Sequence, residues 1–265
     1  AYYVHSKTDV VVLTLLSTVN FVSVYSVYAL ITTGLSSVVS SLCNGFTAQL
    51  GASYGIGDEQ GVQNTFKKYD AFIFNLTVFL FTTASLLIVD FVKIYTHGVN
   101  DADYSQPAFA MLLIMAEAVY CLRMPYNNTV LVAGHFKQTQ YAALVEAAIN
   151  IVVSVVLVGS LGLCGVAVGT LAAMLFRTIY LVVYLSKNIL FLKIGAFIKK
   201  IAAILFTTAL AWGLKWVLPC KFKPSTFLEW IAEALAVSLM VFLCCVIMNL
   251  LFYKRPRTQK NGKEV

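Results

Sequence analysis

The residues of this sequence best suited to chemistry are a few charged and amide side chains inside otherwise apolar stretches. In PAFAMLLIMAEAVYCLRMPYNNTVLVAG, residues 107–134, Tyr120, Arg123 and Asn127 recur at intervals that place them on one face of a helix. An arginine stays protonated at every depth of a membrane and offers a forked pair of donors to a phosphate. This face predicts a functional site, and the next apolar stretch adds the amide of Asn150.

Three carboxylates accompany this arginine: Asp9, Glu117 and Glu146. A charge near the middle of a membrane span costs about 2.5 to 3.5 kcal/mol, so each needs a partner or an aqueous cavity. Glu117 lies about 120° around a helix from Arg123, and we do not expect these two to pair. All three are candidates for ion or proton coupling. For Asp9, a role as helix N-cap is an open alternative, and Thr8 could serve equally.

Two stripes of polar residues recur at intervals of three or four positions in predicted helices. They comprise Glu146, Asn150 and Ser154 in one stretch, and Ser36, Ser40, Asn44 and Thr47 in another. Stripes that face one another would enclose a hydrophilic cavity with the guanidinium and one or two carboxylates. For the Ser and Thr residues the alternative is hydrogen bonding between helices, which contributes well under about 2 kcal/mol each.

Two further features of a later apolar stretch have structural interpretations. Arg177 is expected to extend its long side chain to the headgroups. Gly165 and Gly169 form a GxxxG pair, which predicts close helix packing.

Pro125 is expected to bend its helix just beyond Arg123.

The elements that must position these residues are membrane helices. The sequence is 60% hydrophobic and 12% charged, against roughly 25% charged residues in a soluble domain. No charge lies between Asp9 and Asp58, a stretch long enough for two crossings of about 20 residues each. The first would end near Val19, and the break would fall at 20–23. The remaining spans are predicted at 24–50, 71–92, 107–133, 141–158, 163–185, 197–214 and 227–252. The prediction is an all-α polytopic bundle of about eight spans, with 51–61 as a loop.

The distribution of Lys and Arg predicts the orientation. Most of these residues outside the spans fall in the segments that share a side with the N-terminus, including the basic tail from Lys254, which indicates that both ends are cytoplasmic. The net charge of +7 thus reflects membrane topology, and we expect no nucleic-acid partner. Membrane lipids are expected partners, and the tail is interpreted as a positive-inside anchor, with contact to anionic headgroups as the alternative.

Neither a metal nor a cofactor is predicted. The six cysteines lack metal-ligand spacing, and all except Cys220 lie in apolar stretches, as is typical of small apolar fillers. The three histidines are scattered over different segments.

Several motifs resemble the oligosaccharide flippase branch of the multidrug, oligosaccharidyl-lipid and polysaccharide exporter superfamily. They are GHFKQT at 134–139, the E-x-x-x-N of Glu146 and Asn150, GLCGVAVGT at 162–170, and Thr8 and Asp9 followed by VSVYSVYALI at 22–31. The resemblance implies a two-lobed exporter fold. This chain would supply the second lobe, residues 1–190 with the first span clipped, and two additional C-terminal spans in 191–265. The first lobe would be missing and would be a partner.

The resemblance also implies a function. A flippase of this branch moves a polyprenyl-pyrophosphate-linked oligosaccharide across the bacterial cytoplasmic membrane by alternating access, for surface polysaccharide synthesis. It is not an enzyme, and other polysaccharide assembly proteins would be partners. The pyrophosphate would meet Arg123, and Tyr120, Asn127 and Asn150 would contact the substrate.

Three other functions are kept as alternatives. A drug or cation antiporter of the same superfamily would need an acidic cavity. A membrane-embedded polysaccharide polymerase would need catalytic side chains in an external loop, for which residues 93–106 offer His97, Asp101 and Asp103. A noncatalytic scaffold of a glycan assembly complex would transport nothing.

Overall fold

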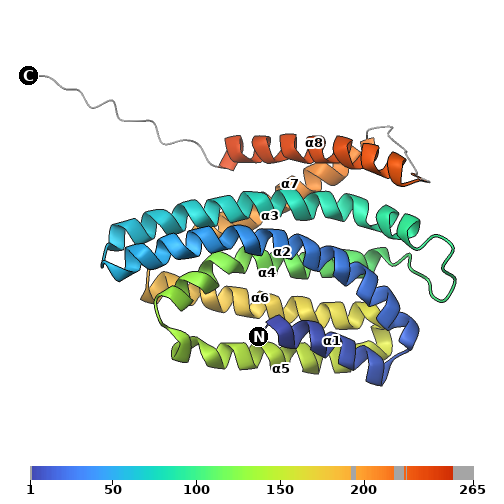
Figure 1. Ribbon diagram of the computed structural model, residues 1–265, viewed down its shortest axis with the longest axis horizontal. Coiled ribbons are helices and arrows are strands. Elements are labelled where there is room, and N and C mark those ends of the chain that lie inside the picture. Colours follow the sequence, from blue (N-terminus) through green and yellow to red (C-terminus); the bar gives the residue numbers. More distant parts are fainter. Residues whose placement is uncertain (1, 192–194, 218–223, 225, 253–265) are drawn as a thin grey trace, which may run out of the picture.

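The computed structural model describes residues 2–191, 195–217, 224 and 226–252, which form a bundle of helices lying roughly side by side (Figure 1). The described residues form eight α-helices: α1 Tyr2–Leu16, α2 Val19–Gly55, α3 Glu59–Tyr95, α4 Pro107–Val132, α5 Phe136–Leu161, α6 Leu163–Asn188, α7 Gly195–Val217 and α8 Phe227–Phe252. Seven of the described helices are long and apolar enough to cross a membrane, and α1 is shorter. The predicted all-α polytopic bundle is confirmed.

The predicted spans from residue 71 onward coincide with helices, but the first break is displaced. It falls at Ser17 and Thr18, where the Thr18 backbone is extended, and not at 20–23. At the end of α1 the Ser17 amide donates a hydrogen bond to the Leu13 carbonyl. At the start of α2 the Phe21 amide donates to the Thr18 carbonyl. Neither Gly nor Pro marks this turn; its only local signal is the polar pair Ser17 and Thr18, a weaker marker because Ser and Thr also recur inside the neighbouring helices.

The predicted loop at 51–61 is wrong for most of its length, because α2 continues to Gly55 and α3 begins at Glu59. The actual turn is short. Gly57 adopts a positive φ of 73°, and the Asp58 carboxylate accepts a hydrogen bond from the Gly61 amide at 2.8 Å as an N-cap. At 37 residues each, α2 and α3 are about 55 Å long. Both therefore extend beyond a hydrocarbon core of about 30 Å.

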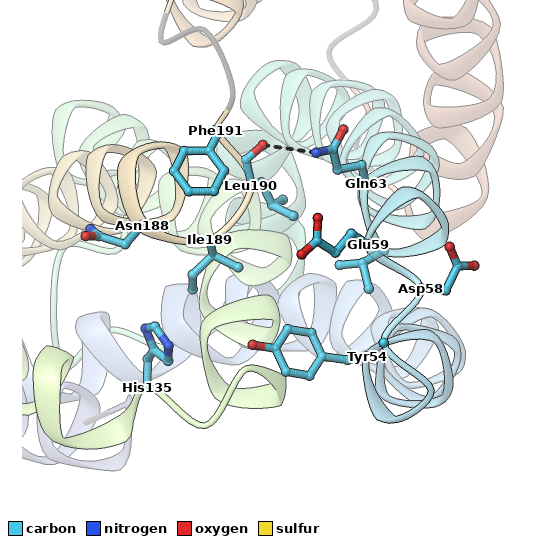
Figure 2. Close-up of a pocket in the computed structure, with 11 residues that line it drawn as sticks. Tyr54, Asp58, Glu59, Gln63, His135, Asn188, Ile189, Leu190 and Phe191 are labelled. Carbon is cyan, nitrogen blue, oxygen red and sulfur yellow. Dashed lines mark hydrogen bonds between the residues drawn. The ribbon is translucent and has the colours of Figure 1, made fainter.

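Successive turns lie at alternate ends of the bundle, as crossings require. At one end, Asn20 at the start of α2 donates to the Asp101 carbonyl of the α3–α4 loop, and Phe21 lies against Gly162 of the α5–α6 turn. At the other end, the α2–α3, α4–α5 and α6–α7 junctions come together (Figure 2). Which end faces the cytoplasm stays a prediction from the lysine distribution.

The closest helix packing is between α5 and α6, which leave the turn at Gly162 as an antiparallel pair. A Cβ atom at Gly165 would lie 2.4 Å from the Leu157 carbonyl oxygen, and one at Gly169 would lie 2.2 Å from the Ser154 hydroxyl. The predicted close-packing face is thus present, and it brings the α6 backbone against α5.

The α7–α8 hairpin packs against α3 with its own apolar cluster, and α8 lies along the edge of the bundle opposite α5 (Figure 1). Lys200 of α7 forms an ion pair with Asp70 of α3 and lies over the Phe74 ring. Asn249 of α8 donates to Asn75 of α3 at 2.7 Å. The division into residues 1–190 and 191–265 stays a prediction; Cys220 and the tail from Lys254 lie outside the described residues.

Replacement of Gly165 by Ala is expected to destabilise the protein by about 1 kcal/mol or more, because the new methyl group meets backbone atoms that cannot move aside. The matched control is Gly213→Ala in α7, where the added atom has nothing within 4 Å and should be neutral or slightly stabilising. Thermal unfolding in detergent measures both. An equal melting temperature for the two variants would contradict the close α5–α6 contact.

Candidate functional site

The polar centre of the bundle is an ion network that joins α4, α5 and α6. Arg123 of α4 donates to Oε1 of Glu146 on α5, and Nε of Arg177 on α6 lies 3.8 Å from Oε2 of the same carboxylate. All three side chains are less than a tenth exposed. Arg177 also donates to the Thr139 carbonyl at 2.7 Å. The expectation that Arg177 extends to the headgroups is therefore wrong: its guanidinium turns inward, where a carboxylate and a carbonyl replace water.

This network contains one more cation than anion. Arg123 and Arg177 share Glu146, so the three side chains carry a formal charge of +1 when Glu146 is ionised. Interactions between charges are several-fold stronger at this low local dielectric than in water. The three side chains together are consequently electropositive, and the buried Glu117 of α4 is a further carboxylate near them.

A cavity of about 230 Å³ lies directly beside the network. Its lining is mostly polar: Ser40, Tyr120, Arg123, Met124, Asn127, Asn128, Glu146 and Arg177. The Arg123 guanidinium carbon lies 5.2 Å from the centre of the Tyr120 ring, as in a cation–π contact. The cavity thus combines three of the four predicted substrate contacts, namely Tyr120, Arg123 and Asn127. Asn150 lies elsewhere.

The predicted polar stripe of α2 divides between two roles. Ser36 is buried and donates to Oε2 of Glu117 at 2.6 Å, which is the hydrogen bonding between helices that was the alternative interpretation. Ser40 is exposed and lines the cavity. Thr47 accepts from Asn128 at 3.1 Å. Glu117 is therefore held against α2 and does not line the cavity with Arg123.

A second buried polar cluster surrounds Asp9, which is 1% exposed. Its carboxylate accepts hydrogen bonds from Tyr25 of α2 at 3.0 Å, from Asn150 of α5 at 3.2 Å and from Thr170 of α6 at 2.8 Å. Because α1 already begins at Tyr2, neither Asp9 nor Thr8 is the N-cap of this helix. Three donors stabilise an ionised carboxylate.

The Asp9 cluster is rich in oxygen atoms that could share a cation. The Asn150 side-chain oxygen is buried without a hydrogen-bond donor within reach, and the Thr170 hydroxyl lies 3.2 Å from the Val166 carbonyl. Tyr25 and Thr170 were not among the predicted site residues. The sequence contained a signal for Thr170, because this residue is the last of the GLCGVAVGT motif and directly follows the close-packed Gly169.

Another cavity, of about 370 Å³, lies at the end of the bundle where three helix junctions meet. Tyr54 and Glu59 extend into it from the α2–α3 turn, toward Ile189 of the α6–α7 junction (Figure 2). His135 of the α4–α5 turn lines it as well, with Nδ1 2.8 Å from the Tyr184 hydroxyl. None of the predicted site residues lines this cavity, and within the described part of the chain no three His, Cys, Asp or Glu side chains are grouped as a metal site.

If the Arg123 cavity contains water, a cysteine at Ser40 will react with a small water-soluble thiosulfonate reagent, because only water supports the reactive thiolate. Val38 is also exposed on α2, but it points about 160° away around the helix and gives the matched control. Labelling is measured by mass spectrometry in a background with the native cysteines replaced. Equal labelling of Ser40→Cys and Val38→Cys would contradict a confined aqueous cavity.

No protein-family model matches the sequence, and no curated protein matches it.

Proposed function

We propose that this membrane protein is the second lobe of a flippase for a polyprenyl-pyrophosphate-linked oligosaccharide. The observation that carries the proposal is the pair of inward-facing arginines, Arg123 and Arg177, at the wall of a polar cavity between membrane helices. An anion that crosses a membrane needs cations that do not lose their protons, and arginine meets this requirement. Asn127, Asn128 and Ser40 supply donors and acceptors suited to sugar hydroxyls.

The first lobe is proposed to dock on the face of α2 beside this cavity. Small residues are exposed there at helical spacing: Gly34, Ser37, Ser41, Gly45 and Ala48. Small residues allow membrane helices to approach closely, while larger apolar residues are typical of lipid-facing surfaces. Ser40, which lines the cavity, lies about 60° around the helix from Ser37, just beyond the edge of this face, so a lobe seated here would lie next to the cavity. Substrate access would then follow from rocking of the two lobes about a site between them.

Coupling is assigned to the Asp9 cluster, with a proton and a monovalent cation as the two alternatives. A buried carboxylate with hydroxyl and amide neighbours suits either one. The cluster is linked to the arginines through α5, since Asn150 and Glu146 lie one helical turn apart. Protonation or cation binding at Asp9 would thus act on a helix that also holds the arginine partner. Glu117 and Glu146, the other predicted coupling residues, contact Ser36 and the arginines instead.

The alternative functions fit these features less well. A cation antiporter would need a cavity of the opposite charge. A polymerase would need free catalytic groups in the α3–α4 loop, but Asp101 accepts from the Tyr104 phenol at 3.3 Å and Asp103 accepts from the Ser105 amide at 2.9 Å. Burial, more than the nearby Asp101, raises the pKa of Tyr104 above its ordinary value and keeps this phenol a donor. A scaffold would not require a polar cavity lined by two arginines.

In the transporter with both lobes, Arg123→Gln is expected to reduce delivery of lipid-linked glycan to the outer leaflet roughly tenfold or more, because a hydrogen bond to a charged group contributes about 1.5 to 3 kcal/mol. Arg123→Lys should retain part of the activity, since it keeps the charge and loses the fork. The control is Lys68→Gln, which removes an exposed charge of α3. Normal surface glycan in an inserted Arg123→Gln variant would refute the assignment.

Asp9→Asn is expected to abolish the response of transport to its driving gradient, because an amide neither takes up a proton nor balances a cation. Transport in vesicles is compared under a proton gradient, under a sodium gradient and without either, with Asp90→Asn on α3 as the control. Loss of the response to one gradient identifies the coupling ion. An unchanged response to both would exclude Asp9 from coupling.

A further inference from the structure

Glu146 occupies the donors that an anionic substrate would use. Its Oε1 accepts directly from Arg123, and its Oε2 lies 3.8 Å from Nε of Arg177, beyond a good hydrogen bond. The carboxylate and both guanidinium groups line the same cavity. A phosphate entering this cavity therefore meets arginines that already hold a carboxylate.

We propose that Glu146 is an internal competitor of the substrate: it pairs with Arg123 and Arg177 when no anion is bound, and it must give up at least part of this pairing when pyrophosphate enters. The inference rests on the proposed function and deepens it. This pairing would favour release of the substrate, because the Glu146 carboxylate binds the two arginines again as the pyrophosphate leaves. Without such a partner, two neighbouring buried guanidinium groups would repel each other and retain the anion.

The two contacts of Glu146 differ, and the difference predicts an order of events. Arg177 is anchored by its hydrogen bond to the Thr139 carbonyl at 2.7 Å and has only a loose contact with the carboxylate. Its remaining N–H groups are the most available donors of the site. Arg177 would therefore meet the incoming anion first, and Arg123 would exchange its carboxylate for phosphate afterwards.

The arrangement of charges also selects the class of anion. Two guanidinium groups on either side of one carboxylate suit a ligand with two adjacent charged groups, which can satisfy both arginines at once. A diphosphate has this form. Monophosphate and sulfate engage the same donors with a single group, so both are expected to bind more weakly than pyrophosphate and to compete less effectively with Glu146.

Glu117 provides the matched control because it is a buried glutamate of the same bundle with a different partner. Its Oε2 accepts from Ser36 at 2.6 Å, and it is absent from the lining of the Arg123 cavity. Replacing either glutamate by Gln removes one buried carboxylate, but it is the change at Glu146 that removes the carboxylate contacting Arg123 and Arg177.

The test measures binding of inorganic pyrophosphate to the protein in lipid nanodiscs, by titration calorimetry and by the shift in melting temperature. Glu146→Gln is expected to bind pyrophosphate at least about tenfold more tightly than wild type, since a charge-assisted contact no longer has to be broken. Glu117→Gln should bind like wild type, and adding Arg123→Gln to Glu146→Gln should cancel the gain. In transport, Glu146→Gln should lower KM and turnover together.

Each outcome has a defined meaning. Equal or weaker binding by folded Glu146→Gln overturns the competitor role and leaves the proposed flippase function standing. Tighter binding, without any glycan delivery by the wild-type transporter with both lobes, supports the competitor role and refutes the flippase function. Should Glu146→Gln fail to fold, Glu146→Asp keeps the charge and withdraws it by one methylene group. This variant should bind pyrophosphate more tightly by a smaller factor, and unchanged affinity in it would overturn the proposal.

Discussion

A charge buried among membrane helices must find its counterpart on another helix, and the structure is organised by this requirement. Arg123, Glu146 and Arg177 connect α4, α5 and α6, and Asp70 with Lys200 fastens α7 to α3. Each contact replaces the hydration that the group would lose in lipid, and breaking one would leave an uncompensated charge at a cost of roughly 3 to 5 kcal/mol. These contacts therefore specify which helix faces lie together, in a bundle whose apolar surfaces alone would permit several arrangements.

The helices were predictable from the sequence because lipid leaves the backbone no alternative to internal hydrogen bonding over an apolar stretch. The predicted helix boundaries were wrong where the ends of the helices do not coincide with the ends of the apolar stretches. The turn at Ser17 and Thr18 lies within a long uncharged stretch, and the glycines between 51 and 55 are helical although they resemble a loop. At the first turn, Asn20 and Phe21 contact distant segments, which local composition does not describe. At the second, Gly57 and the Asp58 cap confine the turn to a few residues.

The site was predictable only in part. Arg123, Tyr120 and Asn127 share a helix, so their spacing alone placed them together, and the cost of burying an arginine marked the site. The partnership of Arg123 with Glu146 and Arg177 depends on how three helices are rotated against one another, which periodicity within one helix does not fix. Asn150 illustrates the same limit: it shares a stripe with Glu146, yet its amide binds Asp9 at 3.2 Å and lies outside the arginine cavity.

The glycine contacts between α5 and α6 have a mechanical consequence. At Gly165 and Gly169 the backbone of α6 lies directly against α5. We expect this contact to resist sliding of one helix along the other, so that α5 and α6 would move as one rigid unit. Because α5 and α6 carry Glu146, Asn150, Thr170 and Arg177, we expect a small displacement at one polar cluster to move the other as well.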